Sequence, residues 1–152
     1  MADSFSIASE ALAVATAGIK LADTLNSYID SVRKAQKHLK PIADHVRLTS
    51  GVLANVGSLM KNEEIKRLCT AELLTSTNDT LRGCRRAFRD LEKFVSKLMK
   101  AEENGKFSMS ASTKLTFSFK QKELDVLQAH LERFKSSLDL VLGVLNLASS
   151  AK

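Results

Sequence analysis

Few residues of this chain have the types and spacing that perform catalysis or bind metal. The three histidines are His38, His45 and His130, and the first two are seven residues apart in one expected helix. Two metal ligands on a helix usually stand at i and i+4, so this spacing does not predict a zinc site. Cys69 and Cys84 form no CxxC pair and have no histidine at ligand spacing, which favours buried, reduced thiols. Because no P-loop, GxGxxG, HExxH or GxSxG pattern occurs either, we expect no enzyme activity, no cofactor and no metal.

Basic residues recur at spacings of three and four between positions 82 and 100. At about 100° per residue they lie nearly opposite an apolar stripe on the same expected helix. One interpretation is a solvated outer face, and the other is a platform for anionic lipid headgroups, which attract nearby Lys and Arg by about 1 kcal/mol each. The basic set is Arg82, Arg86, Arg89, Lys93, Lys97 and Lys100, and the apolar set is Leu81, Cys84, Phe88, Leu91, Val95 and Leu98.

The net charge of +6 suits nucleic acid as well as acidic lipid. The basic stripe, however, carries no aromatic residues for base stacking, and Tyr28 is the only tyrosine of the chain. No helix-turn-helix or zinc-finger pattern supports base readout. The sequence therefore favours anionic lipid as the partner and predicts no binding of nucleic acid.

The segment from Phe5 to Ile29 is apolar or small on nearly every face, with only three charges, Glu10, Lys20 and Asp23. A helix of this kind is either buried in a core or able to leave the bundle for a membrane. The two interpretations are compatible, because one chain can adopt both states. Each charge opposes insertion by roughly 2.5–3.5 kcal/mol at the bilayer centre. We expect Lys20 to pair with Asp23, and insertion to need oligomers that bury the charges.

The chain start and the charge spacing predict neither secretion nor permanent membrane insertion. Met1-Ala2-Asp3 lacks the basic start of a secretory signal. The longest charge-free stretch of the first segment covers residues 11–19, well short of the roughly 20 residues that a spanning helix needs.

Length and composition predict one helical domain over residues 1–152. The chain is 44% hydrophobic and has one proline and six glycines, which favours long helices. A first helix is expected over about 4–32, capped by Asp3 or Ser4, and a second over about 36–60 with Pro41 in or near its first turns. Asn62 begins a short helix that continues to about Leu73. The polar run 75–80 either interrupts it or lies outside one longer helix.

A helix over 81–100 is expected to end at 102–105, with Gly105 as its C-cap, and residues 108–113 are expected to form a loop. The final helix, about 114–148, carries a seven-residue apolar repeat, while Phe117 and Phe119 belong to a short extended piece or to its first turn. The repeat predicts a core helix or, alternatively, a coiled-coil dimer. Its members are Leu124, Leu127, Leu131, Phe134, Leu138, Val141 and Leu145.

One-sided apolar stripes on all these helices must pack on one another. The predicted fold class is therefore all-α, a helical bundle of four to five helices with mostly antiparallel neighbours.

Two stretches resemble a known family. The opening, from Ser6-Ile7-Ala8 through Gly18-Ile19-Lys20-Leu21 to Tyr28-Ile29-Asp30-Ser31-Val32, resembles the start of fungal N-terminal effector domains of the HeLo-like kind. The closing stretch, 119–138, is similar to the final helix of that family. Relative to the family, this chain has Pro41 where a proline near Gln36 is more usual, and it carries no amyloid motif or nucleotide-binding module.

The resemblance implies a bundle similar to the four-helix killer domain of the mixed-lineage kinase-like pseudokinase. It also implies a role in programmed cell death and heterokaryon incompatibility, by permeabilising the plasma membrane. The partners it implies are anionic membrane lipids, further copies of the chain as a homo-oligomer, and an upstream sensor or amyloid-signalling module. The domain is expected in the cytoplasm at rest and at the plasma membrane on activation. The membrane-insertion residues so implied are Phe5, Ile7, Leu12, Val14, Gly18, Ile19, Leu21 and Leu25. A helical adaptor that oligomerises without touching lipid is the alternative function.

Overall fold

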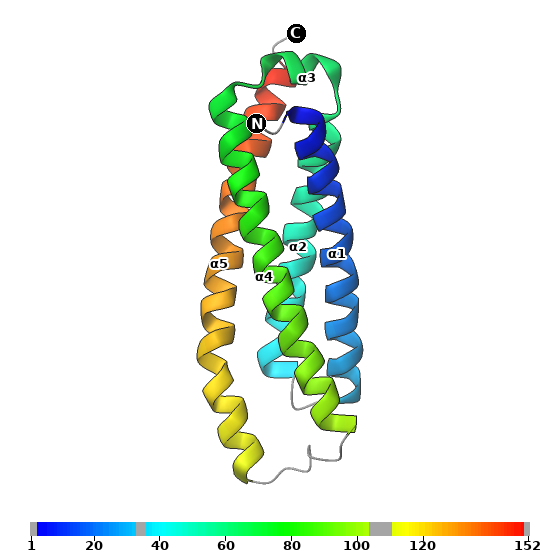
Figure 1. The fold of residues 1–152 in the computed structure, drawn as a ribbon, viewed down its shortest axis with the longest axis vertical. Helices are drawn as coiled ribbons and strands as arrows, with labels where there is room; N and C mark the ends of the chain where they lie inside the picture. The colour runs from blue at the N-terminus through cyan, green and yellow to red at the C-terminus, as the bar shows by residue number, and fades with distance from the viewer. Residues whose placement is uncertain (1–2, 33–35, 104–110, 151–152) are drawn as a thin grey trace.

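The computed structural model describes residues 3–32, 36–103 and 111–150, and every regular element in these ranges is an α-helix. The helices are α1 (Ser4–Ser31), α2 (Gln36–Met60), α3 (Glu63–Leu68), α4 (Ala71–Glu103) and α5 (Ala111–Ser150). Four of them are long and lie side by side along the length of the molecule, while α3 sits at one end (Figure 1). The all-α helical bundle predicted from the sequence is confirmed.

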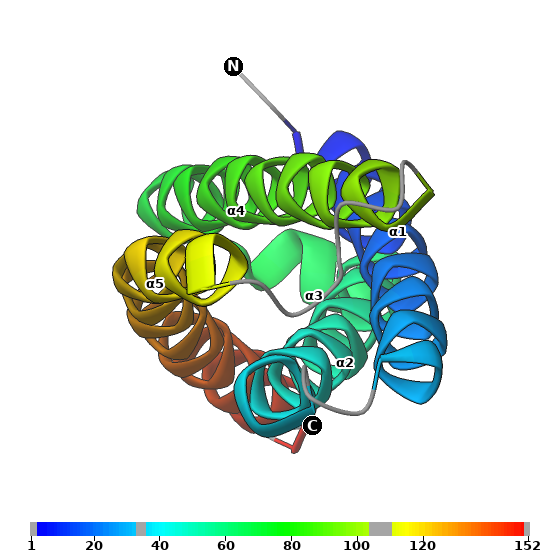
Figure 2. The ribbon, with the colours of Figure 1, turned by 90° about the horizontal axis from the view of Figure 1, so that it is seen from below.

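The long helices follow one another around the bundle in the order α1, α2, α5, α4 (Figure 2). The pairs α1/α2 and α4/α5 are antiparallel hairpins. Between the hairpins, α3 carries the chain from α2 to the diagonally opposite α4. As a result α2 runs parallel to α5, and α1 runs parallel to α4 (Figures 1 and 2).

Short polar side chains begin three of the helices. The Asp3 carboxylate accepts a hydrogen bond from Ser6 N at 2.7 Å, which confirms one of the two predicted caps of α1. The Asn62 side chain accepts from Glu64 N at 2.9 Å and begins α3, as predicted. The Thr70 hydroxyl accepts from Leu73 N at 3.1 Å and begins α4.

The cap at Thr70 settles how residues 62–80 fold. Because Cys69 is extended and Thr70 starts a new helix, α3 ends at Leu68. The prediction that this short helix continues to Leu73 is wrong. The polar run 75–80 lies within α4 and does not interrupt it.

The last helix starts three residues earlier than predicted, at Ala111 instead of 114. Residues 111–113 were predicted as a loop because serine and threonine favour caps and turns, but this weak preference yields to continuation of a long helix. Phe117 and Phe119 are both helical. The remainder of the predicted loop and the predicted cap Gly105 lie outside the described residues.

The core lies between the four long helices, where their apolar stripes meet. The inner stripe of α4 is buried throughout, and so is most of the seven-residue repeat of α5. The repeat is therefore a core stripe, as the first of the two interpretations predicted. Pro41 lies in the second turn of α2 and is exposed, so its missing N–H affects only a carbonyl near the helix start.

Candidate functional site

Helix α1 is a core helix in this structure. Of the residues predicted to enter a membrane, Ile7, Val14, Gly18, Leu21 and Leu25 are buried and Leu12 is half-buried. Phe5 and Ile19 are the exceptions, with 58% and 41% of their surface exposed. Helix α1 therefore contributes to the core and also presents apolar side chains to solvent.

Glycines bring α1 and α2 into close contact. A Cβ atom placed on Gly18 would collide with Ser50 Oγ of α2 and would lie 2.7 Å from the Phe88 ring of α4. A Cβ atom on Gly57 would lie 2.8 Å from Leu12 Cγ and 3.1 Å from the Ala8 carbonyl oxygen. These positions need glycine because the neighbouring atoms occupy the space of a side chain.

Each carboxylate within the body of α1 is paired with an arginine of another helix. Glu10 forms an ion pair with Arg85 of α4. Asp23 Oδ1 lies 2.6 Å from Arg47 Nη2 of α2. The predicted pairing of Asp23 with Lys20 is therefore wrong for the bundle, in which the partner of Asp23 is an arginine of the neighbouring helix.

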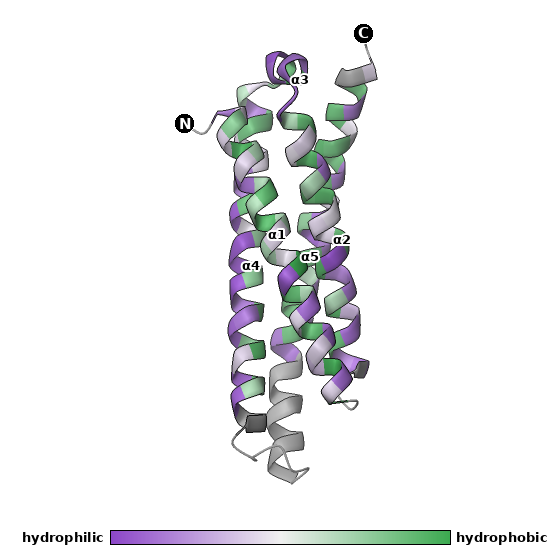
Figure 3. Ribbon diagram, turned by 90° about the vertical axis from the view of Figure 1, so that its right-hand side faces the viewer, coloured by the Kyte–Doolittle hydropathy of each residue, from purple (hydrophilic) through white to green (hydrophobic). Residues whose placement is uncertain are grey.

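By length and composition, α1 qualifies as a helix that could cross a membrane, and it is the only such helix in the described part of the chain. A buried helix of a soluble protein passes the same test, so this property alone assigns no membrane function. Figure 3 shows the contrast between α1, which is hydrophobic or pale along most of its length, and α4, whose outward side is hydrophilic.

The six basic residues predicted as a headgroup-binding face are all exposed on α4, opposite its buried stripe. We call Arg82, Arg86, Arg89, Lys93, Lys97 and Lys100 the basic face. No ion pair joins the basic face to another side chain that the structure describes. This exposure agrees with both interpretations, a solvated face and a platform for anions.

The cysteines and histidines form no reactive centre. Cys84 is buried, and this burial raises the pKa of its thiol to about 12, so it remains protonated near neutral pH. Cys69 is half-buried, and its pKa is also raised by burial. In the ranges that the structure describes, no three His, Cys, Asp or Glu side chains are placed to hold a metal ion.

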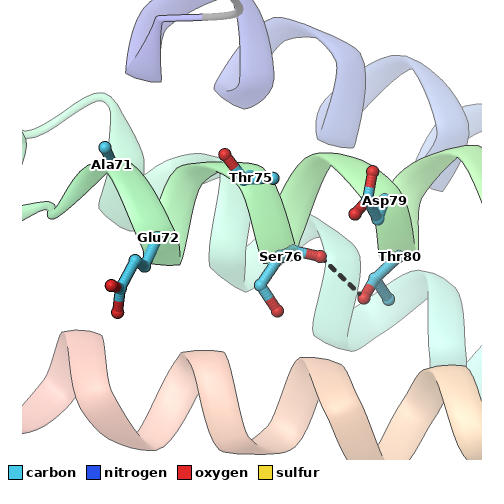
Figure 4. A pocket seen from close by; sticks show the side chains of 6 residues that line it. All are labelled: Ala71, Glu72, Thr75, Ser76, Asp79 and Thr80. Carbon is cyan, nitrogen blue, oxygen red and sulfur yellow. Dashed lines mark hydrogen bonds between the residues drawn. The ribbon is translucent and has the colours of Figure 1, made fainter.

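The first turns of α4 line a shallow, open depression. Figure 4 shows the side chains that line it. Its lining is hydroxyl-rich, with Thr75, Ser76 and Thr80 beside Glu72 and Asp79. The Thr80 hydroxyl donates a 3.0 Å hydrogen bond to the Ser76 carbonyl oxygen. These groups are exposed or half-buried and include no imidazole or thiol that would activate a nucleophile.

Sequence reasoning missed an apolar surface on the outer side of α5. Leu140 and Leu147 are 74% and 73% exposed, and Val144 between them is half exposed. The signal was present in the sequence, because Val126, Leu140 and Leu147 are separated by multiples of seven residues. It was overlooked because the inner repeat of the same helix accounts for its burial.

Comparison with known proteins identifies a family for this chain but no individual relative. No curated protein and no solved structure matches it. One protein family does match, over residues 2–152. The match supports a fungal effector-type domain, the class in which HeLo-like domains also fall. The chain belongs to the family described as pigment biosynthesis cluster protein PigL, N-terminal.

Proposed function

We propose that this domain is a membrane-targeting effector that permeabilises membranes rich in anionic lipid. The observation that carries the proposal is the nature of α1, an apolar helix of membrane-spanning length whose two interior carboxylates are held by arginines of other helices. Lipid is a second environment in which such a helix is stable once its acids are neutralised.

The proposed mechanism has two states. At rest α1 is packed in the bundle, where Arg85 and Arg47 hold Glu10 and Asp23. Clustering by an upstream sensor brings copies together on the membrane, and the basic face attracts the domain to acidic headgroups. Helix α1 then leaves the core and enters the bilayer beside other copies of itself. Small residues such as Ala11, Ala15 and Gly18, which allow close packing here, also suit helix association in lipid.

The release of α1 is tested by clamping it in place. Glu10 and Arg85 are replaced by cysteines in a Cys69→Ser background and joined by a reducible bifunctional thiol reagent. We expect the clamped protein to release no dye from anionic liposomes, and dye release to return when the link is reduced. This design keeps all of the core, whereas deleting residues 1–20 would remove more than half of α1.

An unlinked double variant gives the reference activity for this experiment. Equal dye release by the clamped and reduced forms would contradict the release of α1. No dye release by the parent protein at any liposome composition would contradict membrane permeabilisation itself.

The basic face is tested by charge reversal. The triple variant Arg86→Glu, Arg89→Glu and Lys93→Glu is expected to lose co-sedimentation with anionic liposomes, with the largest difference from the parent at low salt, because headgroup attraction is screened by ions. A matched control reverses Lys20, Lys37 and Lys61, which are exposed on α1, at the start of α2 and beyond its end. Equal losses in the two triple variants would reduce the effect to net charge, and unchanged binding of the first would leave a merely solvated face.

A second candidate function is a helical adaptor that self-associates without lipid. It is favoured by one observation, the exposed apolar residues Leu140, Val144 and Leu147 on α5. Sizing the protein with and without liposomes separates this candidate from the membrane effector.

A further inference from the structure

The outer side of α5 carries a second seven-residue repeat, opposite the one that forms the core. Val126, Arg133, Leu140 and Leu147 form a line of bulky residues along it, each seven residues from the next. All four side chains are exposed. Helix α5 stands at a corner of the bundle (Figure 2). A single isolated leucine on a surface needs no explanation, but a repeated line on one helix face does.

A line of small residues runs beside the bulky line. Ala129, Ser136 and Gly143 follow the bulky residues at a spacing of three, and all are exposed. A Cβ atom on Gly143 would meet nothing within 4 Å, so the space outside this position is open. Bulky and small residues at spacings of three and four form the seam along which two helices interlock. We call these two lines together the outer seam.

We infer that the outer seam is an interface between two copies of this chain, in which their α5 helices pack antiparallel about a two-fold axis. The antiparallel register puts each bulky residue opposite a small one. Leu147 of one copy faces Ala129 of the other, and Leu140 faces Ser136. Because the two-fold axis repeats every contact, one seam supplies both surfaces.

The charged residues of α5 also favour the antiparallel orientation. In a parallel, in-register pair, Arg133 would lie against Arg133 of the second copy, and the like charges would repel. In the antiparallel pair Arg133 lies over Gly143, one helical turn from the Asp139 carboxylate of the second copy. Asp139 is exposed and is already drawn to a cation within its own chain, Lys135 Nζ at 3.1 Å. The arrangement is therefore complementary in both size and charge.

The inference stands on α5 alone and is independent of membrane activity, since the dimer forms in solution without lipid. One helix pair is a small interface, so we expect reversible dimerisation in the micromolar range. Sedimentation of the full chain over a range of concentrations should show this dimer. The variant Leu140→Lys with Leu147→Lys should remain monomeric at every concentration.

Two controls accompany the sedimentation experiment. Leu48→Lys changes another exposed leucine, which lies on α2 outside the seam and is 59% exposed, and it should leave the dimer intact. At a protein concentration too low for dimerisation, thermal unfolding of each variant should match that of the parent, because the substituted side chains are exposed. A parent that stays monomeric at all concentrations, or a dimer that survives the double substitution, would overturn the inference.

Orientation is tested separately with a spin label at Ala129→Cys in a Cys69→Ser background. In the antiparallel dimer the two labelled positions are 18 residues apart along the pair, about 27 Å at 1.5 Å per residue. In a parallel, in-register dimer the two labels would instead lie close together, and such a short distance would overturn the antiparallel pairing. If the seam is instead a lipid-binding surface, the parent is monomeric in solution and the double variant loses liposome binding, an outcome that also overturns the inference.

Discussion

Gly18 lies where α1 packs against both α2 and α4. Because any side chain there would collide with Ser50 and Phe88, Gly18→Val should destabilise the bundle by about 2 kcal/mol or more. Gly51 is the matched control, since a Cβ atom there meets nothing within 4 Å. Gly51→Ala should instead stabilise the bundle by about 0.5–1 kcal/mol through helix propensity. Denaturant unfolding of the two variants measures both effects, and equal stabilities would contradict the close packing of α1.

At the residue scale, the sequence predicted correctly which side of a helix is buried, but it did not predict which charged side chains form ion pairs. The buried and exposed sides of α4 follow from spacing alone, because a helix separates residues by a fixed angle. The partner of Asp23 could not be predicted in the same way. Lys20 is its neighbour along the chain, whereas Arg47 is brought beside it only by the packing of α2 on α1.

The boundary between α3 and α4 depends on one hydroxyl. Thr70→Ala removes the acceptor for Leu73 N, and we expect a loss of about 1 kcal/mol in the free energy of unfolding. Thr75→Ala, within the same helix and exposed, is the control and should be nearly neutral. Equal effects of the two substitutions in denaturant unfolding would mean that the cap at Thr70 contributes nothing.

Helix existence and type were predictable for all four long elements, because three have a long apolar stripe of helical period and α1 is apolar or small on nearly every face. The ends were less predictable. Asp3 and Asn62 are strong caps followed by helix formers and were recognised, whereas Thr70 is one of several hydroxyl residues in a polar region. The outer seam of α5 shows a further limit, since a helix whose inner face explains its burial gives little reason to inspect its outer face.

For the whole molecule, the buried thiol of Cys84 makes stability depend on alkaline pH. Burial raises its pKa from 9.0 to about 12 in the folded state. The unfolded chain therefore loses this proton at a lower pH than the folded one. The contribution of Cys84 to the free energy of unfolding is therefore fully present below pH 9. It falls as the pH rises toward 12, with a slope approaching about 1.4 kcal/mol per pH unit.

This dependence is isolated by comparison with Cys84→Ala. The alanine variant is less stable at neutral pH because it leaves a cavity, but its stability should fall less steeply above pH 9. Urea unfolding between pH 8 and pH 10.5 measures the difference between the two slopes. Parallel pH profiles would show that Cys84 ionises as readily in the folded state as in the unfolded one.

For the whole bundle, only the fold class could be predicted from the sequence. One-sided stripes require a bundle, but they do not fix the order of the helices around it. That order depends on α3, a helix of six residues that directs the chain across the end of the molecule.

This diagonal crossing makes residues 61–70 the only covalent connection between two hairpins that share a single hydrophobic interior. A protease that cut the backbone at exposed Arg67 would therefore produce two fragments, each a helical pair with an apolar side and no partner of its own. The fragments should remain associated after the cut and, if separated in denaturant, should recombine when mixed. The protein could thus be divided into two complementing pieces at α3.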